Sequence, residues 1–557
     1  TTMQTLQFQP GGVFEQQQQS QSINKQDQHS VLGLYERTVG SRSAFQFSFH
    51  SNFFQNQNQF SSTSSSIFRD TLENASLRAI RDQTSRQSIV GDVSWRIQSG
   101  KQLGRIFSIK TGFLTTDYST DGYLYTINSF FKPDGNALGA DTVDQRKHIT
   151  DHSLKVHGDI GYTQPFFTGS TLSFILGSPV EYDNPLQATF GRGQGKYDEA
   201  IDSLTSYIGT RTINSQGMIV LQGKSRHINY TFITTWLDYI YRQRDQQTDS
   251  VFHLHYISWV PRFLLNYTPR ASFNVKIDYS AATQQPSISQ LAPIKNNNDP
   301  LHLTLGNPNL RPGTDQKLEL GFHWLRSWIV AVNLNFRVSN NSISTKTTTD
   351  SLGRQISQPV NVNGGSSAGA NFSVNHRLAG IDWSLHTADS YNRTINFLNT
   401  DLNRNDLYSI SEGIGASRYV ERKYSFQFNT NFSWLYSRSS VNISTPLHYW
   451  TQSHFGMVSL FFVPHYEIGT NATFTWQQKT NAFSNSSSVL LWNAYVSRNF
   501  LRDKLAVKAT INNLLDQNAG ITRTSISNIS TETSTNILGR YWMVSVMYHF
   551  DKKFSSK

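Results

Sequence analysis

The sequence predicts an all-β fold: a large, closed, antiparallel transmembrane β-barrel of about 22 strands, with short periplasmic turns and long extracellular loops. Three observations predict it. Apolar and polar residues alternate over runs of about 9–13 residues, and a tilted strand needs roughly 9–11 residues to cross a bilayer. Aromatic residues make up 13% and charged residues only 16% of the chain, against about 25% charged in soluble domains. Short and long connections alternate along the chain.

Composition excludes several classes of protein. The 557 residues include no cysteine, which excludes disulfide scaffolds, thiol catalysis and cysteine-based zinc sites. The apolar runs stop far short of the roughly 18 residues that a transmembrane helix needs. The net charge is +11, but the basic residues are scattered and form no stripe, so no nucleic-acid partner is expected. The excess charge suits outer-membrane lipid and lipopolysaccharide, or an acidic ligand.

The strands are predicted from period-two alternation, in which one face of each run is apolar. In chain order, the clearest runs begin at Phe45, Phe273, Trp328, Tyr424 and Trp542. The predicted lipid face of the third run consists of Trp328, Val330, Val332, Leu334 and Phe336. The predicted lumen face is rich in amides and includes Asn333, Asn335, Gln427, Asn429, Asn431 and Ser433. A soluble β-sandwich also alternates, but its strands are shorter and its outer face carries more Lys and Glu.

The connections predict the orientation. Tight turns are expected at 325–327, at 378–380 and at Asp121-Gly122, a hairpin dipeptide. Long loops are expected at residues 61–85, 185–200, 284–314, 340–359 and 394–407. Outer-membrane barrels keep their long loops outside. The turn at 325–327 should therefore be periplasmic, and the loop at 340–359 extracellular.

We expect one domain, a transmembrane β-barrel over residues 1–557. Division by about 25 residues per strand and connection gives about 22 strands, and the count of strand-like segments gives 20–22. Residues 1–30 are the weakest part, because 16–19 and 26–28 form a Gln-rich tract that suits a mobile loop inside the first hairpin. In residues 68–81, apolar residues recur weakly at helical spacing, which predicts a short helix within a loop. No plug domain is recognisable in the chain.

Sixteen histidines raise the question of a metal or catalytic site. His253 and His255 share one strand face and could bind a metal, but no carboxylate cluster is near in sequence. His148, His152 and His157 lie close to Asp151, Ser153 and Asp159, yet alternate residues of a strand point to opposite faces, so these groups cannot all converge. The Gly-rich segment 191–195 lacks the strand-to-helix context of a phosphate loop. We therefore expect no enzyme activity, no cofactor, and no catalytic, cofactor-binding or metal site.

Four segments carry a resemblance to a known family: 279–286, Gly306-Asn307-Pro308-Asn309-Leu310-Arg311-Pro312, the Asn-Leu-Leu-Asp stretch in 511–517, and the closing strand in 539–550. These segments resemble the TonB-dependent receptor-like outer-membrane β-barrel family of Bacteroidota, a relative of the SusC-like transporters. Gly313 departs from the pattern, because an acidic residue is commoner there. A tail follows Phe550. The plug and the TonB-contacting segment of the family are not recognisable.

The resemblance implies uptake of a nutrient, such as a glycan, peptide or metal chelate, across the bacterial outer membrane. It also implies partners: a plug domain, TonB, a surface lipoprotein and a small-molecule or oligomeric ligand. The alternative is a non-transporting barrel that scaffolds a surface lipoprotein or secretion complex. The substrate is not predicted, because the long loops carry no recognisable motif.

Overall fold

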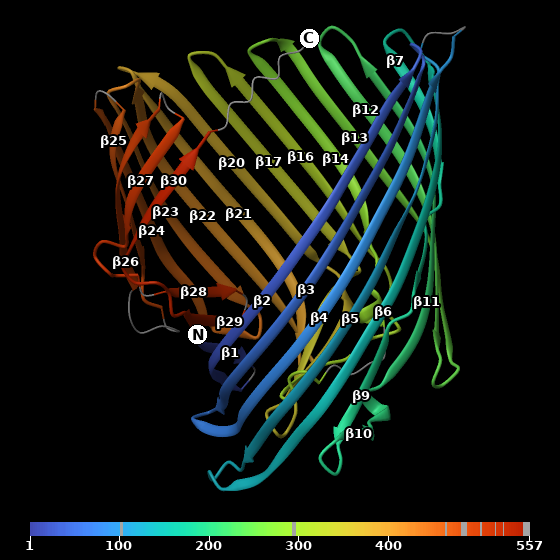
Figure 1. Ribbon diagram of the computed structural model, residues 1–557, viewed down its shortest axis with the longest axis vertical. Coiled ribbons are helices and arrows are strands. Elements are labelled where there is room, and N and C mark those ends of the chain that lie inside the picture. The colour runs from blue at the N-terminus through green and yellow to red at the C-terminus, as the bar shows by residue number, and fades with distance from the viewer. Residues whose placement is uncertain are drawn as a thin grey trace.

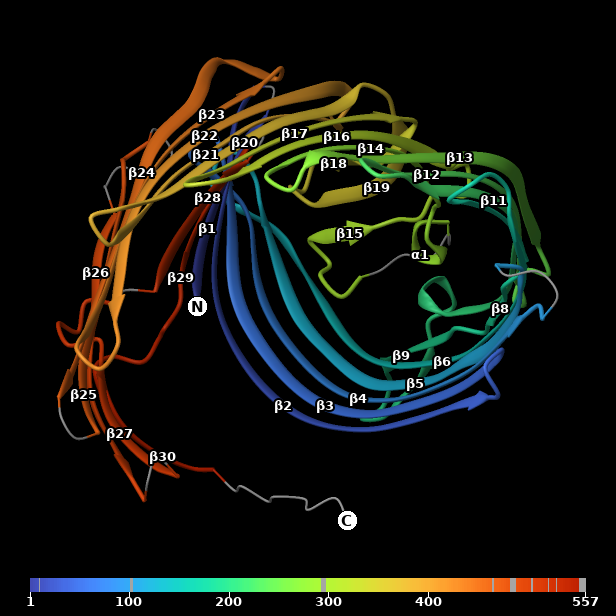
Figure 2. The same ribbon diagram turned by 90° about the horizontal axis from the view of Figure 1, so that it is seen from above.

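The computed structural model describes residues 1–549 except 10, 101–103, 292–296, 463–464, 481–486, 502–503, 519 and 527. Its strands all belong to one sheet of 30 strands, wound into a large barrel-shaped wall (Figures 1 and 2). The predicted fold class is confirmed. Phe550 and the tail that follows it lie outside the described residues. No helix among the described residues is long and apolar enough to cross a membrane.

The wall strands follow one another along the chain and around the barrel. They are β2 Gly12–Val39, β3 Ser43–Phe68, β4 Thr71–Gln98, β5 Ile106–Phe131, β6 Ala137–Pro165, β7 Ser170–Gly177, β8 Val180–Asp183, β9 Leu186–Arg192, β11 Ser206–Lys224, β12 Ile228–Asp245, β13 Val251–Arg270, β14 Phe273–Gln284, β16 Gly313–Leu325, β17 Trp328–Asn340, β20 Gly365–Leu378, β21 Ile381–Leu398, β22 Asp401–Val420, β23 Tyr424–Ser439, β24 Asn442–Phe462, β25 Tyr466–Gln477, β26 Ser487–Phe500, β27 Leu505–Asn512 and β30 Tyr541–Tyr548.

The remaining elements are short and lie in connections or at the chain start. They are β1 Thr2–Gln9, β10 Tyr197–Ala200, β15 His302–Thr304, β18 Ser342–Thr349, β19 Gln355–Val362, β28 Ile521–Ile526, β29 Ile529–Ser534, the single helical turn α1 Ile288–Leu291, and a 3₁₀ turn at Asp202–Leu204.

The sheet has more strands than the predicted 22 for two reasons. The connections contain short strands of their own, and one wall strand is broken into β7, β8 and β9, all of which pair with both β6 and β11. The breaks fall at Pro179 and Pro185. Proline has no N–H to give to a ladder, so it interrupts pairing.

Several predicted connections are wrong. The strands β3 to β6 are 26–29 residues long and include two of the expected connections, and the expected loop at 185–200 contains the strands β9 and β10. Asp121-Gly122 lies within β5 and pairs with β4 and β6, so long-range pairing overrides local turn preference. The expected loop at 61–85 and the expected helix at 68–81 are strand instead, joined by a turn at Arg69-Asp70, where both residues have positive φ. The expected loop at 394–407 is a hairpin with its turn at 399–400.

The Gln-rich tract of residues 1–30 is also ordered strand and not a mobile loop. It forms the start of β2 and pairs residue by residue with the Ser- and Gln-rich half of β3, from Phe14–Phe68 onward. Polar, uncharged runs extend these strands beyond the length that crosses a bilayer. Both faces of these extensions contact water, so they lack the alternation of apolar and polar residues that predicts a strand.

The turns at 326–327 and 379–380 are confirmed, and the longest connections leave the opposite rim (Figure 1). The predicted lipid face is also confirmed by the register. Tyr239 and Tyr241 point into the lumen, where they pack against α1. The ladders from β12 to β17 then place Val330 and Val332 on the outer face of the wall.

Candidate functional site

Two connections fold into the lumen instead of extending away from the barrel. One joins β14 to β16 and carries α1 and β15; the other is the β18–β19 hairpin. Figure 2 shows α1, β15, β18 and β19 inside the ring of wall strands. The two connections are joined by a short parallel ladder, from His302–Gln355 to Thr304–Ser357. We refer to the described residues of 288–310 and to Ser342–Val362 as the inner layer.

One side of the inner layer is attached to the wall by apolar contacts. Leu291, at the end of α1, and Leu310 are each 1% exposed and cluster with Tyr239 and Tyr241 of β12. Leu310 belongs to the Asn-Pro-Asn-Leu turn that the sequence singled out. In that turn the Asn307 side chain accepts the Asn309 N–H at 3.0 Å and donates to the Pro359 carbonyl at 2.9 Å. The turn therefore presses Leu310 into the core of the layer.

The opposite side is attached by polar contacts to β4 and β6. Lys147 of β6 donates from Nζ to the side-chain oxygens of Asn297 and Asn298, at 2.6 and 2.5 Å. Arg78 of β4 lies 2.5 Å from a carboxylate oxygen of Asp299. These partners are more than 140 residues apart in sequence, and they join walls that face each other across the lumen (Figure 2).

The hairpin of the inner layer makes a third attachment. The Asn74 side chain of β4 donates to the Leu352 carbonyl at 3.1 Å, and Gln355 donates to the Gln7 side chain at 2.8 Å. The tip between β18 and β19 is held by Asp350, whose carboxylate accepts the Arg354 N–H at 2.9 Å and its guanidinium Nε at 2.7 Å. The layer is thus fixed at three places around the lumen.

The electrostatics differ between the two polar anchors. Lys147 lies nearer the long-loop end of β6, beyond the roughly 9–11 residues next to the short turn that cross the bilayer. Burial lowers its pKa to about 8, although the negative charge of Asp82 opposes this shift. At Asp299, burial raises the pKa, but the hydrogen bond from His302 and the charges of His302 and Arg78 outweigh it, and the pKa lies below its usual range.

The pKa of Lys147 predicts a pH dependence of the layer's attachment. When the layer opens, Lys147 meets water and its pKa returns toward 10.5. The attached state then binds fewer protons than the open state between about pH 8 and about pH 10.5, so attachment strengthens as pH rises through this window. We expect limited proteolysis of residues 285–312 to slow over this range. The Lys147→Met variant is the control for the pH dependence of the protease itself. If the cleavage rate changed equally with pH in both proteins, the expectation would be refuted.

The structure separates the candidate histidines. His148 and His152 face outward and contact Asp121 and Asp117, whereas His157 faces the lumen and contacts Asp92. The prediction that this group does not converge is confirmed. His253 and His255 do share the outer face, as predicted, and His255 lies 2.7 Å from Asp238. Within the described part of the chain, no three His, Asp or Glu side chains gather to hold a metal ion.

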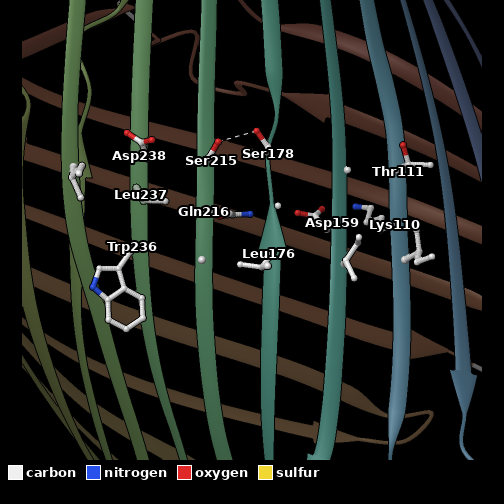
Figure 3. A pocket seen from close by; sticks show the side chains of 16 residues that line it. Lys110, Thr111, Asp159, Leu176, Ser178, Ser215, Gln216, Trp236, Leu237 and Asp238 are labelled. Carbon is white, nitrogen blue, oxygen red and sulfur yellow. Dashed lines mark hydrogen bonds between the residues drawn. The ribbon is translucent and has the colours of Figure 1, made fainter.

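A separate depression of about 790 Å³ lies in the wall between β5 and β13. Its outward lining is mostly apolar and includes Leu176, Trp236 and Ile257, although Asp238 also lines it from the outer face. Lys110 and Asp159 belong to the inner face beneath it (Figure 3). Gly217 pairs with Leu176 on one neighbouring strand and with Trp236 on the other, and because it has no side chain it leaves room for the depression. Because these strand segments lie within the bilayer-crossing part, the depression suits lipid chains and not a polar nutrient.

Sequence reasoning missed the anchors of the inner layer. Lys147, Arg78 and Asn297 stand in no motif, and nothing local distinguishes them from other polar residues of the strands and loops. The only usable signal was the Asn-Pro-Asn-Leu turn, which the sequence offered only as part of the family resemblance. Contacts in the lumen between segments more than 140 residues apart depend on how the barrel curves. The alternation of apolar and polar residues does not predict them.

The model of the outer membrane protein β-barrel family matches residues 98–419, more than half of the chain. The chain belongs to this family. Membership confirms the predicted location in the bacterial outer membrane. No curated protein matches the sequence.

Solved structures resemble this family member over nearly the whole chain, at low identity. The copper transporter OprC is 8% identical, with a TM-score of 0.47, over 99% of this chain and 80% of that one. The ferric citrate transporter FecA is 9% identical, with a TM-score of 0.44, over 98% and 78%. The siderophore receptor PirA from Pseudomonas aeruginosa is 12% identical, with a TM-score of 0.36, over 98% and 80%. At these scores the likeness carries no argument about the ligand of this chain.

Proposed function

We propose that this chain is the barrel of a TonB-dependent receptor-like protein that takes up a nutrient across the outer membrane. The nutrient would be a glycan, a peptide or a metal chelate, captured by the long extracellular connections. The observation that carries the proposal is the inner layer, attached to facing walls by Leu310, Lys147 and Arg78. A barrel of this size without internal structure encloses an aqueous channel. An attached layer suits a gated receptor better than an open pore.

The two kinds of attachment suggest how the layer would move. The contacts of Lys147 with Asn297 and Asn298 are hydrogen bonds between polar side chains, and water or a ligand can replace them at little net cost. The Leu291 and Leu310 side chains are buried against Tyr239 and Tyr241, and their exposure would be costly. We therefore expect the layer to open at its β4–β6 side and to remain attached at β12. The plug domain, TonB and a surface lipoprotein remain proposed partners.

The test is planar-bilayer conductance of the intact gene product with the polar side of the layer detached. The double variant Lys147→Met with Arg78→Gln removes the two charged anchors of the layer, while the hydrogen bonds of the β18–β19 hairpin with Asn74 and Gln7 remain. We expect its conductance to rise at least several-fold over the unaltered protein. The control is Lys155→Met, which removes a lysine of the same strand and face that pairs with Glu181 of the wall at 3.1 Å.

Equal conductance in the double variant, the control and the unaltered protein would refute a gating role for the layer. If the unaltered barrel also co-purified with a surface lipoprotein and took up no ligand, the scaffold alternative would replace the transport proposal.

A further inference from the structure

A cleft of about 780 Å³ lies on the outer face of the wall, over the long-loop half of β3 to β6 (Figure 1). The register gives the face. Lys147 of β6 points into the lumen, where it binds Asn297, so its neighbour Arg146 points outward. Arg146 pairs with Tyr123 of β5, which pairs with Arg81 of β4. The cleft is thus separated from the inner layer by the thickness of the sheet.

The cleft also lies well above the hydrocarbon layer. On the outer face of β5 and β6, the apolar pair Phe113–Val156 gives way to the polar pair Asp117–His152, whose side chains are 2.6 Å apart. Tyr123 follows Asp117 by 6 residues in the same strand, which is roughly 20 Å along the strand. In the outer leaflet this height is occupied by the sugars of lipopolysaccharide and not by its acyl chains.

Tyrosine rings form the floor and one side of the cleft. Tyr123 is 42% and Tyr125 41% exposed, and Tyr125 pairs with Ala79, whose small side chain leaves room above the floor. Tyr197 of β10 forms the side, with its ring centroid 5.4 Å from that of Tyr123 in an edge-to-face arrangement. Such rings offer a flat apolar surface of the kind that the C–H face of a pyranose can cover.

The side of the cleft is held in place by Asp144 of β6. The Tyr197 hydroxyl donates to Asp144 Oδ1 at 2.7 Å, and Arg192 Nη1 donates to Oδ2 at 3.2 Å. The guanidinium carbon of Arg192 also lies 5.8 Å from the ring centroid of Tyr197. The ring is therefore positioned before any ligand arrives, which lowers the entropy cost of binding.

The rest of the outward lining is polar, and most of it is uncharged. Gln57 pairs with Gln83, and Gln59 pairs with Arg81; amides can both donate and accept, as sugar hydroxyls do. The charge of Arg146 is balanced by Asp121 at 2.8 Å. The ladder neighbours of Arg81, Gln59 and Tyr123, carry no charge. Arg81 is thus positioned to meet an acidic or phosphorylated sugar.

We propose that this cleft binds the saccharide chain of a neighbouring lipopolysaccharide. A pyranose ring lies on Tyr123 and Tyr125 beside Tyr197, its hydroxyls bond the glutamines, and an acidic or phosphate group meets Arg81. The position of the cleft selects this occupant, because it opens sideways into the sugar layer of the membrane and not into the lumen. The inference is independent of the transport proposal, since the cleft shares no side chain with the anchors of the inner layer.

The test is calorimetric titration of the intact, detergent-purified protein with three probes: lipopolysaccharide of the native membrane, the core oligosaccharide released from it, and lipid A without sugars. The double variant Tyr123→Ala with Tyr197→Ala removes two of the rings. We expect its affinity for lipopolysaccharide and for the released oligosaccharide to fall on the order of tenfold or more, and its affinity for lipid A to stay unchanged. Ala79→Trp, which fills the cleft and keeps the tyrosines, should have the same effect.

The matched control is Tyr207→Ala, which removes an outward, 37% exposed tyrosine from the long-loop half of β11, outside the cleft. Heat modifiability verifies that each variant has folded before it is titrated. Affinity for the released oligosaccharide that is equal in the double variant, in Ala79→Trp and in the control would overturn the inference. Binding through lipid A alone would also overturn it. A cleft that bound an unrelated soluble polysaccharide but not the core oligosaccharide would rule out lipopolysaccharide as its occupant.

Discussion

Phe428→Arg should nearly abolish assembly of the barrel, whereas Asn429→Arg should leave most of it intact. Phe428 lies near the start of β23, on the outer face, paired with Ala416 and Gly456. An arginine there faces hydrocarbon and costs about 2–4 kcal/mol near the bilayer midplane. Asn429 is its neighbour on the lumen face, where water can solvate the charge. The measurement is the fraction of heat-modifiable, folded protein in the outer membrane.

This pair is a matched control in itself, because the two variants differ by one position and share strand, charge and depth. Equal folded yields would show that the outer and lumen faces of β23 are wrongly assigned. The assignment rests on the ladder register from β12 to β23 and on the polar contacts of the lumen face, where Asn431 accepts from Ser411 at 3.1 Å and donates to Ser433 at 3.0 Å.

Leu310→Asp should detach the inner layer while the wall remains folded. Leu310 is buried with Leu291 against Tyr239 and Tyr241, and a carboxylate there would lose its hydration without a partner. Replacing a buried leucine even by alanine typically costs about 2–5 kcal/mol, and the charge adds to this. We expect rapid limited proteolysis within residues 285–312, together with an unchanged melting temperature of the barrel.

The control for this variant is Leu138→Asp, a leucine 53% exposed at the start of β6. It carries the same change of charge in the same long-loop half of the barrel. If Leu310→Asp were cleaved no faster than this control, the apolar contact would not hold the layer. A lower melting temperature of the whole barrel would show that the layer and the wall fold as one unit.

The membrane-crossing part of the fold could be predicted because it obeys one strict pattern. Runs such as Trp328–Phe336 must alternate, since one face meets lipid and the other meets water. The extensions of β2, β3, β4 and β5 beyond the bilayer obey no such rule, so Asp121-Gly122 and the Gln-rich tract were misinterpreted. Their strand conformation comes from pairing with neighbours that are already in place, which local sequence does not encode.

The inner layer illustrates a second limit. The turn around Leu310 was visible in the sequence, but its contact with Tyr241 and the anchoring of Asn297 by Lys147 were not. Each contact brings together residues that are far apart along the curved sheet and the chain, and neither end carries an unusual residue type. The strand order places them near one another, and the lengths of the two connections then allow them to meet inside the lumen.

The central claim is that the inner layer of this barrel obstructs its lumen at rest. The most direct test is planar-bilayer conductance of the unaltered, full gene product without added ligand. The structure predicts no large, steady conductance, with only brief openings when the β4–β6 side of the layer detaches. A large, steady and ungated conductance would contradict the claim and would identify the protein as an open porin.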